Sequence, residues 1–273
     1  RGHRLCEELG RGRLDVSAVL EVNAGFEFPS QTFSVATGDQ TRKLKCSGID
    51  LELYGATVDV AMLGLPTLRV LMASGIPILG GVHLSQRLKQ IEPFHLEEEI
   101  TISGRVMEIN PHPRGCILRC EFSYARGDGT VCVEAVRSGI TPIGPKEVSE
   151  GIPRPDESLD GFSEIMRRTL VPQNVANYSD EAGNLIHSDP EVAREHGFRA
   201  PIAAGLMGIH FYREALEKRY TPKAFDLEVW FRRPMFWDDT LSLVACEEGG
   251  RITRMHLLGS DGKPTSNCVV HAV

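Results

Sequence analysis

The sequence lacks the features that mark a membrane-spanning, secreted or nucleic-acid-binding protein. No apolar run is long enough to cross a bilayer, and no secretory signal opens the 273-residue chain. A net charge of −7 argues against binding of nucleic acid through bulk electrostatics. The chain is 41% hydrophobic and 25% charged, as is normal for a globular protein. We therefore expect a cytoplasmic protein with neither a membrane nor a nucleic acid as partner.

The cysteines form no recognisable metal or redox motif. There are seven, an odd number, and no Cys-x-x-Cys pair is present. Cys116 and Cys120 are four residues apart, which places both on one face of a strand but supplies no further zinc ligands. We therefore expect no metal site, and free thiols in a reducing compartment.

The chain contains an internal repeat. The motif Pro-Ile-x-x-Gly at residues 77–81 recurs at residues 201–205, and Asp-Gly turns lie at residues 127–129 and 260–262. We expect an apolar helix after each Pro-Ile-x-x-Gly motif, followed by antiparallel strands that include an Asp-Gly hairpin. This pattern predicts a duplicated α+β unit in which one buried helix is wrapped by an antiparallel sheet, made twice.

Strand and linker signals set the boundaries of the two halves. Alternating or β-rich runs predict strands at residues 99–106, 115–124, 130–136, 225–231, 240–246, 251–258 and 266–273. Residues 58–63 and 68–72 fit a helix or a strand equally well. Residues 142–160 are rich in Pro, Gly, Glu and Ser and have no apolar period. We place a linker at residues 146–162, between repeats at 1–145 and 163–273.

A histidine lies directly before a strong helix start. His187 precedes Ser188 and Asp189, either of which suits an N-cap, and a proline follows in the first turn. Gly197 suits the C-terminal end of the same helix. We expect a short helix over residues 191–196, with Asp189 as its cap rather than as a catalyst and His187 on a loop.

A second and very apolar helix is expected to begin at Gly205. The apolar residues Leu206 and Met207 open it, a pattern typical of a buried helix. The first amide N–H groups of a helix have no partner within it, and a glycine lets a ligand approach the backbone closely. We predict that Ala204, Gly205 and Leu206 bind a substrate oxygen that becomes negative during a reaction.

Three stretches of the second half together resemble the MaoC-like (R)-specific enoyl-CoA hydratases of the double hot-dog type. They are Asn184-x-Ile186-His187-x-Asp189-Pro190, Gly197-Phe198-x-x-Pro201-Ile202-x-x-Gly205-Leu206, and Phe231-Arg232-Arg233-Pro234-Met235-Phe236-x-Asp238-x-Thr240-Leu241. The resemblance runs from about residue 168 to the C-terminus and is only architectural before it. It implies a double hot-dog fold whose first repeat has lost its catalytic loop and shapes the acyl pocket.

The resemblance also implies roles for individual residues. His187 matches the catalytic histidine of the family, and Asn184 matches its asparagine. The family's catalytic aspartate falls at Ala182, so Asp180 becomes the candidate replacement, with Glu181 as the other nearby acid. The histidine of the family's Pro-Ile-x-His-Gly motif is also missing, because Ala204 stands in its place. No metal is implied.

The reaction implied is addition of water to a trans-2-enoyl thioester, or dehydration of an (R)-3-hydroxyacyl thioester. The substrate would carry coenzyme A or the phosphopantetheine of an acyl carrier protein, and no separate cofactor is implied. Arg232 and Arg233 either meet the phosphates of such a carrier or form a solvated pair. Two alternatives stay open: a non-catalytic acyl-thioester-binding protein, and an acyl-CoA thioesterase on the same fold. A monomer and a homodimer both fit two repeats in one chain.

The other histidines considered have no supporting pattern, and we expect them to be ordinary. They are His83, His95, His112, His196, His210, His256 and His271.

Overall fold

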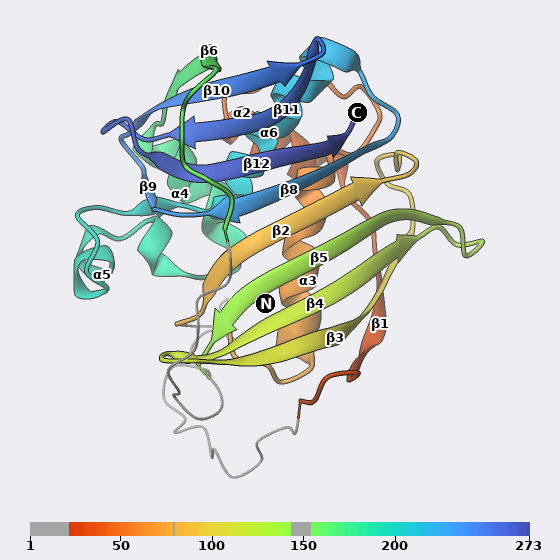
Figure 1. Cartoon of the computed structure of the whole chain (residues 1–273). Coiled ribbons are helices and arrows are strands. Elements are labelled where there is room, and N and C mark those ends of the chain that lie inside the picture. The colour runs from red at the N-terminus through yellow and green to blue at the C-terminus, as the bar shows by residue number, and fades with distance from the viewer. Residues whose placement is uncertain (1–21, 79, 143–153) are drawn as a thin grey trace.

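The computed structural model describes residues 22–78, 80–142 and 154–273. They form a continuous ten-stranded antiparallel sheet that curves around two central helices (Figure 1). Among the described helices, none is both long and apolar enough to cross a membrane. The cysteines in these ranges are free thiols, and Cys6 lies outside them.

The first half contributes one side of the sheet and a buried helix. Its elements are β1 (Glu27–Phe33), α2 (Thr37–Cys46), the 3₁₀ turn η1 (Val60–Leu63), α3 (Gly64–Ala73), β2 (Val82–Gln90), β3 (Ile100–His112), β4 (Gly115–Ala125) and β5 (Val131–Thr141). The strands predicted at residues 99–106, 115–124 and 130–136 are confirmed as β3, β4 and β5.

The predicted helix after residues 77–81 is wrong. Residues 82–90 form strand β2, and the buried helix of this half is α3, which lies before the motif. β2 pairs with β5 on one side and with β8 (Phe225–Phe231) on the other, so even the polar side chains of Ser85 and Gln86 are buried. A central strand of this kind loses the alternation of polar and apolar residues by which a strand is recognised. The first-half counterpart of Gly205 is therefore Gly64, the first residue of α3, and not Gly81.

The second half follows the same plan with extra short elements. They are β6 (Phe162–Thr169), α4 (Pro172–Ser179), η2 (Asp180–Ala182), η3 (Leu185–His187), α5 (Pro190–Glu195), β7 (Ile202–Ala203), α6 (Gly205–Tyr220), β8, β9 (Met235–Phe236), β10 (Thr240–Glu248), β11 (Arg251–Leu258) and β12 (Pro264–Ala272). The predicted strands are confirmed as β8, β10, β11 and β12, and the two predicted helices as α5 and α6. Asp189 caps α5 by accepting a hydrogen bond from the N–H of Glu191 at 2.8 Å.

The strand order shows that the two halves are related. It runs β1-β3-β4-β5-β2-β8-β12-β11-β10-β6, so β2 and β8 meet in the centre and the order on one side mirrors that on the other. This is the expected α+β double hot-dog fold. The predicted linker falls partly on residues 143–153, which lie outside the described residues; residues 154–161 form neither helix nor strand, and β6 begins at Phe162.

Pairing of β2 with β8 brings the two buried helices together. Both α3 and α6 lie on the same side of the sheet (Figure 1). The side chain of Leu206, in the first turn of α6, lies against Gly64 and leaves no room there for a Cβ atom. The N-terminal ends of the two helices therefore meet in the interior.

A buried charge cluster joins the helices at this junction. Asp59, which is completely buried, accepts a hydrogen bond from the N–H of Ala61 and lies 2.5 Å from Nδ1 of His210 on α6. Arg213, one turn further along α6, lies 3.9 Å from the same carboxylate. Burial alone would raise the pKa of Asp59, but the charge and hydrogen bond of His210 and the charge of Arg213 lower it below its usual value.

We predict that Asp59→Ala lowers the free energy of unfolding by about 3–5 kcal/mol, because it leaves the buried Nδ1 of His210 without its partner and removes a carboxylate from beside Arg213, which keeps only its ion pair with Glu217. Urea denaturation at pH 7 measures this. Asp39→Ala removes an exposed carboxylate from α2 and should change the stability by less than about 0.5 kcal/mol. Since the pKa of Asp59 is lowered on folding, its contribution is present above the unfolded-state pKa and is lost as the pH falls through the folded-state value. Equal stability of Asp59→Ala and wild type would contradict this role.

Candidate active site

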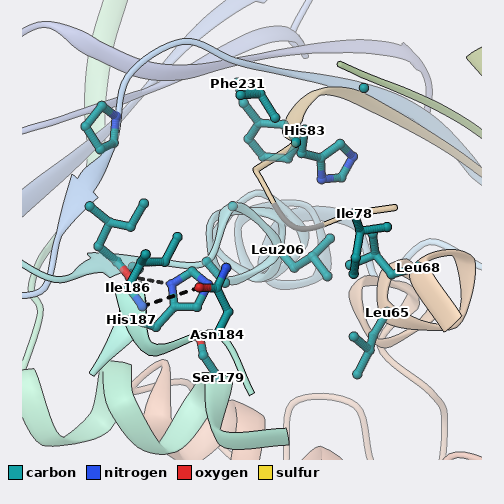
Figure 2. A pocket seen from close by; sticks show the side chains of 18 of the residues that line it. Leu65, Leu68, Ile78, His83, Ser179, Asn184, Ile186, His187, Leu206 and Phe231 are labelled. Carbon is teal, nitrogen blue, oxygen red and sulfur yellow. Dashed lines mark hydrogen bonds between the residues drawn. The ribbon is translucent and has the colours of Figure 1, made fainter. Parts of the chain in front are cut away.

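A cavity of about 660 Å³ lies where the two repeats meet and is lined by residues of both. Leu65 and Leu68 of α3, together with Ile78 and Leu206, form an apolar wall. His187 and Asn184 lie on the opposite side, with Phe231 and His83 above (Figure 2). The cavity therefore combines polar groups at one end with an apolar space large enough for an acyl chain.

His187 is held in a single tautomer. Its Nδ1 lies 2.7 Å from the carbonyl oxygen of Ile202, and a carbonyl can only accept, so Nδ1 carries the hydrogen and Nε2 keeps its lone pair. Burial lowers the pKa of His187, the hydrogen bond to Ile202 partly opposes this, and the charge of Lys43 lowers the pKa further. The imidazole is consequently neutral at pH 7, with an unprotonated Nε2, and His187 lines the cavity.

The start of α6 opens onto the same cavity. Ala204, Gly205 and Leu206 all line it, and Ala204 is an N-cap residue whose side chain caps nothing. Within the described residues, no acceptor pairs with the N–H of Gly205 or Leu206. The ring of Phe231 covers Gly205 so closely that a Cβ atom there would lie 2.9 Å from its Cε1. Two backbone donors are thus available at the positive end of a buried helix.

Asn184 shapes the loop that carries His187. Its side-chain oxygen accepts a hydrogen bond from the N–H of Ile186 at 3.4 Å and caps the 3₁₀ turn η3. Because the oxygen is used in this way, the NH₂ group of Asn184 is the part that can donate to a ligand in the cavity.

The candidate carboxylate Asp180 is not in the site. It is exposed at the end of α4 and does not line the cavity, because the chain turns into η2 there. Its neighbour Glu181 lines the cavity instead, and its carboxylate pairs with Lys43 Nζ at 2.6 Å and with Arg42, both on α2. Burial would raise the pKa of Glu181, but these two cations lower it. Of residue 182 only the backbone, in η2, belongs to the described structure.

Three cavity residues of the first half were not anticipated. The ring of His83 packs against Phe231 with centroids 4.6 Å apart, and burial and the charge of Arg137 lower its pKa well below the usual value. Lys43 and Arg137 are also buried and line the cavity. No local motif marks any of the three, because strand pairing and helix packing, rather than sequence spacing, bring them to this place.

The side chains of Arg232 and Arg233 already have hydrogen-bond and ion-pair partners within the protein. Both pair with Glu157, and Arg233 Nη1 also donates to the carbonyl oxygen of Pro264 at 2.8 Å. Arg232 also donates to the side chain of Asn267 and to the carbonyl oxygen of Pro155. These contacts favour a structural role over phosphate binding. No group of three or more His, Cys, Asp or Glu within the described ranges is placed to hold a metal ion.

Comparison with known proteins identifies the fold. No family model matches the sequence, and no curated protein matches it. HtdX from Mycobacterium tuberculosis is 19% identical with a TM-score of 0.70, over 89% of this chain and 99% of that one. The chain has the fold of the MaoC-like dehydratases.

Two further solved structures support this assignment. A MaoC-like dehydratase from Phytophthora capsici is 17% identical with a TM-score of 0.63, over 89% of this chain and 96% of that one. The peroxisomal multifunctional enzyme type 2 of Drosophila melanogaster is 19% identical with a TM-score of 0.68, over 89% of this chain but only 48% of that one. Structures described as thioesterases also match. At these identities the likeness establishes the MaoC-like fold and leaves the chemistry to the residues of the cavity.

We predict that Gly205→Ala destabilises the protein by about 1–3 kcal/mol, because the new methyl group must displace the ring of Phe231. Gly208→Ala, one turn along the same helix, is the matched control. Its methyl group would lie 3.4 Å from Met235 Cε, an ordinary contact, and should be neutral or stabilising by up to about 1 kcal/mol. Thermal and urea denaturation measure both variants, and equal effects at the two positions would contradict the close approach at Gly205.

Proposed function

We propose that this protein adds water to trans-2-enoyl thioesters, or removes it from (R)-3-hydroxyacyl thioesters. The observation that supports this most directly is that a neutral His187, fixed in one tautomer, shares a cavity with the uncapped start of α6. A general base and a pair of backbone donors are the two groups that such a reaction requires.

The proposed chemistry begins with a water held by His187 Nε2 and the NH₂ group of Asn184. As the water oxygen attacks C3 of the enoyl thioester, Nε2 takes its proton and the electrons of the double bond move to the carbonyl oxygen. The N–H groups of Gly205 and Leu206 stabilise the resulting enolate. The protonated His187 Nε2 then gives this proton to C2, which restores the carbonyl and the neutral base. Dehydration is the same sequence in reverse.

We also propose that Glu181 takes the place of Asp180 as the acidic residue of the site. Glu181 lines the cavity and is held by the pair of cations from α2, whereas Asp180 is outside. Burial lowers the pKa of His187 and keeps the base neutral, and the positive charge of Lys43 adds to this effect. Coenzyme A or the phosphopantetheine of a carrier protein would enter as part of the substrate, without a further cofactor.

One observation favours the alternative of an acyl-thioester-binding protein. A cation beside His187 opposes the positive charge that the imidazole must acquire when it takes a proton. Binding without turnover therefore stays a second candidate. A thioesterase is a third, since thioesterases are among the proteins of similar fold.

We expect His187→Gln to lower kcat for hydration by at least about 100-fold, because it removes the general base while keeping a side chain of similar polarity. The loss of enoyl-thioester absorbance with crotonyl-CoA and longer enoyl-CoA substrates measures this. His196→Gln, which changes another histidine of the same cavity, should keep activity within about twofold. Full activity of His187→Gln would remove His187 from the mechanism. Binding of acyl-CoA without turnover by wild type would indicate the binding protein, and release of free thiol from saturated acyl-CoA would indicate the thioesterase.

The pH dependence of wild type provides an independent check on the same group. Because His187 must be unprotonated to act and its pKa is lowered below 6.5, kcat/KM should rise with pH on a limb whose midpoint lies below 6.5. The rate should be flat from there through pH 7.5. A midpoint above 6.5, or the same limb in His187→Gln, would show that another group is being titrated.

A further inference from the structure

Arg137 on β5 is a buried charge without a partner. It is only 8% exposed, its Nη1 has no hydrogen-bond partner, and within the described ranges no carboxylate forms an ion pair with it. Cys120 and Tyr124 lie nearby, but burial raises the pKa of both, to about 12 for Cys120, so neither is negative at neutral pH. Burial lowers the pKa of Arg137 to about 10, which leaves it protonated. An unpaired buried guanidinium destabilises a fold, so its presence points to an anion that binds there.

The register of the sheet places this charge in the cavity wall. Arg137 lies opposite Cys120 on β4, and Gly139 lies opposite Leu118, so these four residues share one face of the sheet. All four line the cavity. Gly139 has no side chain, and Arg137 Nη2 lies 3.8 Å from the place a Cβ atom would occupy. The guanidinium therefore lies along the floor of the cavity, where a larger residue at 139 would crowd it.

The residue that lies opposite Arg137 on the other neighbouring strand is uncharged. Gln86 of β2 lies opposite Arg137, and its side-chain oxygen is also buried without a hydrogen bond. An amide oxygen cannot compensate a full positive charge. The charge of Arg137 is therefore available to a ligand that carries the opposite sign.

Arg137 lines the part of the cavity that the first repeat contributes. His187 and Gly205 come from the second repeat, and the ring of Phe231 covers Gly205. His83 packs against the ring of Phe231 and experiences the charge of Arg137. Leu65, Leu68 and Ile78 extend beside these rings (Figure 2). A chain whose carbonyl is bound at Gly205 would pass along these apolar side chains toward the first repeat.

We propose that Arg137 binds a carboxylate at the distal end of the acyl chain, so that the preferred substrates are thioesters of dicarboxylic acids. This inference rests on the proposed hydratase function and adds a substrate class to it. A guanidinium presents parallel N–H donors that match the two oxygens of a carboxylate. Phosphates of the carrier are a poorer match, because the buried guanidinium shares its face of the sheet with Leu118 and Cys120, a setting that suits the end of a hydrocarbon chain.

The test compares two trans-2-enoyl-CoA substrates of equal length, one ending in a methyl group and one in a carboxylate. We expect wild type to have a kcat/KM at least about tenfold higher for the carboxylate-ended substrate. Arg137→Met should lower kcat/KM for that substrate by about 100-fold and leave or raise that for the methyl-ended one, because a buried charge pair is lost. Arg119→Met, on the adjacent strand β4 with an exposed guanidinium paired to Glu108, should change neither value.

Two results would overturn the proposal: a wild-type preference for the methyl-ended substrate, or an equal loss on both substrates in Arg137→Met. Arg137→Lys, which keeps the charge, should keep part of the preference. Folding is checked by the melting temperature of Arg137→Met, which should not fall, since the variant removes an unpaired charge.

Failure of the hydratase function can be told apart from failure of this inference. If wild type hydrates neither substrate, calorimetry with saturated CoA thioesters that end in a methyl group or a carboxylate tests Arg137 alone. Tighter binding of the carboxylate-ended thioester that is lost in Arg137→Met supports the anion site. Equal binding of the two thioesters by wild type overturns it.

Discussion

The buried contact between Asp59 and His210 sets the two central helices against each other. Asp59 caps the turn that leads into α3, and His210 lies within α6, so a single carboxylate belongs to both repeats. With β2 and β8 paired on the sheet side, this contact leaves Leu206 lying against Gly64. The cavity is the space that remains beside that junction, so its shape follows from how the two halves are joined.

This arrangement explains why the two halves contribute differently to the site. The second half brings a base, His187, and the open start of α6, while the first half brings the apolar residues of α3 and the charges of Lys43 and Arg137. The cavity is therefore asymmetric, with a histidine and open backbone amides from one repeat and apolar side chains and buried cations from the other.

Local patterns in the sequence correctly predicted those features that depend only on residues close together in the chain. The strands β8 and β11 have the predicted bounds, Asp189 caps α5, and α6 begins at Gly205 because caps, turns and periodicity are local properties. The helix predicted after residues 77–81 failed because β2 is covered on both sides and buries Ser85 and Gln86, which hides its strand period. The predicted fold class was nevertheless correct, because the strand signals of both halves were strong.

The site was predictable only in its second-half part. His187, Asn184 and Gly205 line the cavity as the motif suggested, whereas Asp180 does not line it and the neighbouring Glu181 does. Arg137 and Lys43 could not be found by spacing, because their place depends on strand register and on packing between α2 and α4. Long-range pairing of this kind cannot be predicted from the spacing of residues in a single sequence.

The proposed function requires that one acyl thioester contacts both His187 and the start of α6. The most direct measurement is a crystal structure of the protein with an unreactive saturated acyl-CoA. We expect a thioester oxygen within about 3 Å of the N–H of Gly205 or Leu206, with C3 of the chain next to His187 Nε2. A thioester bound elsewhere, or one whose oxygen meets neither amide while His187 faces no part of the chain, would contradict it.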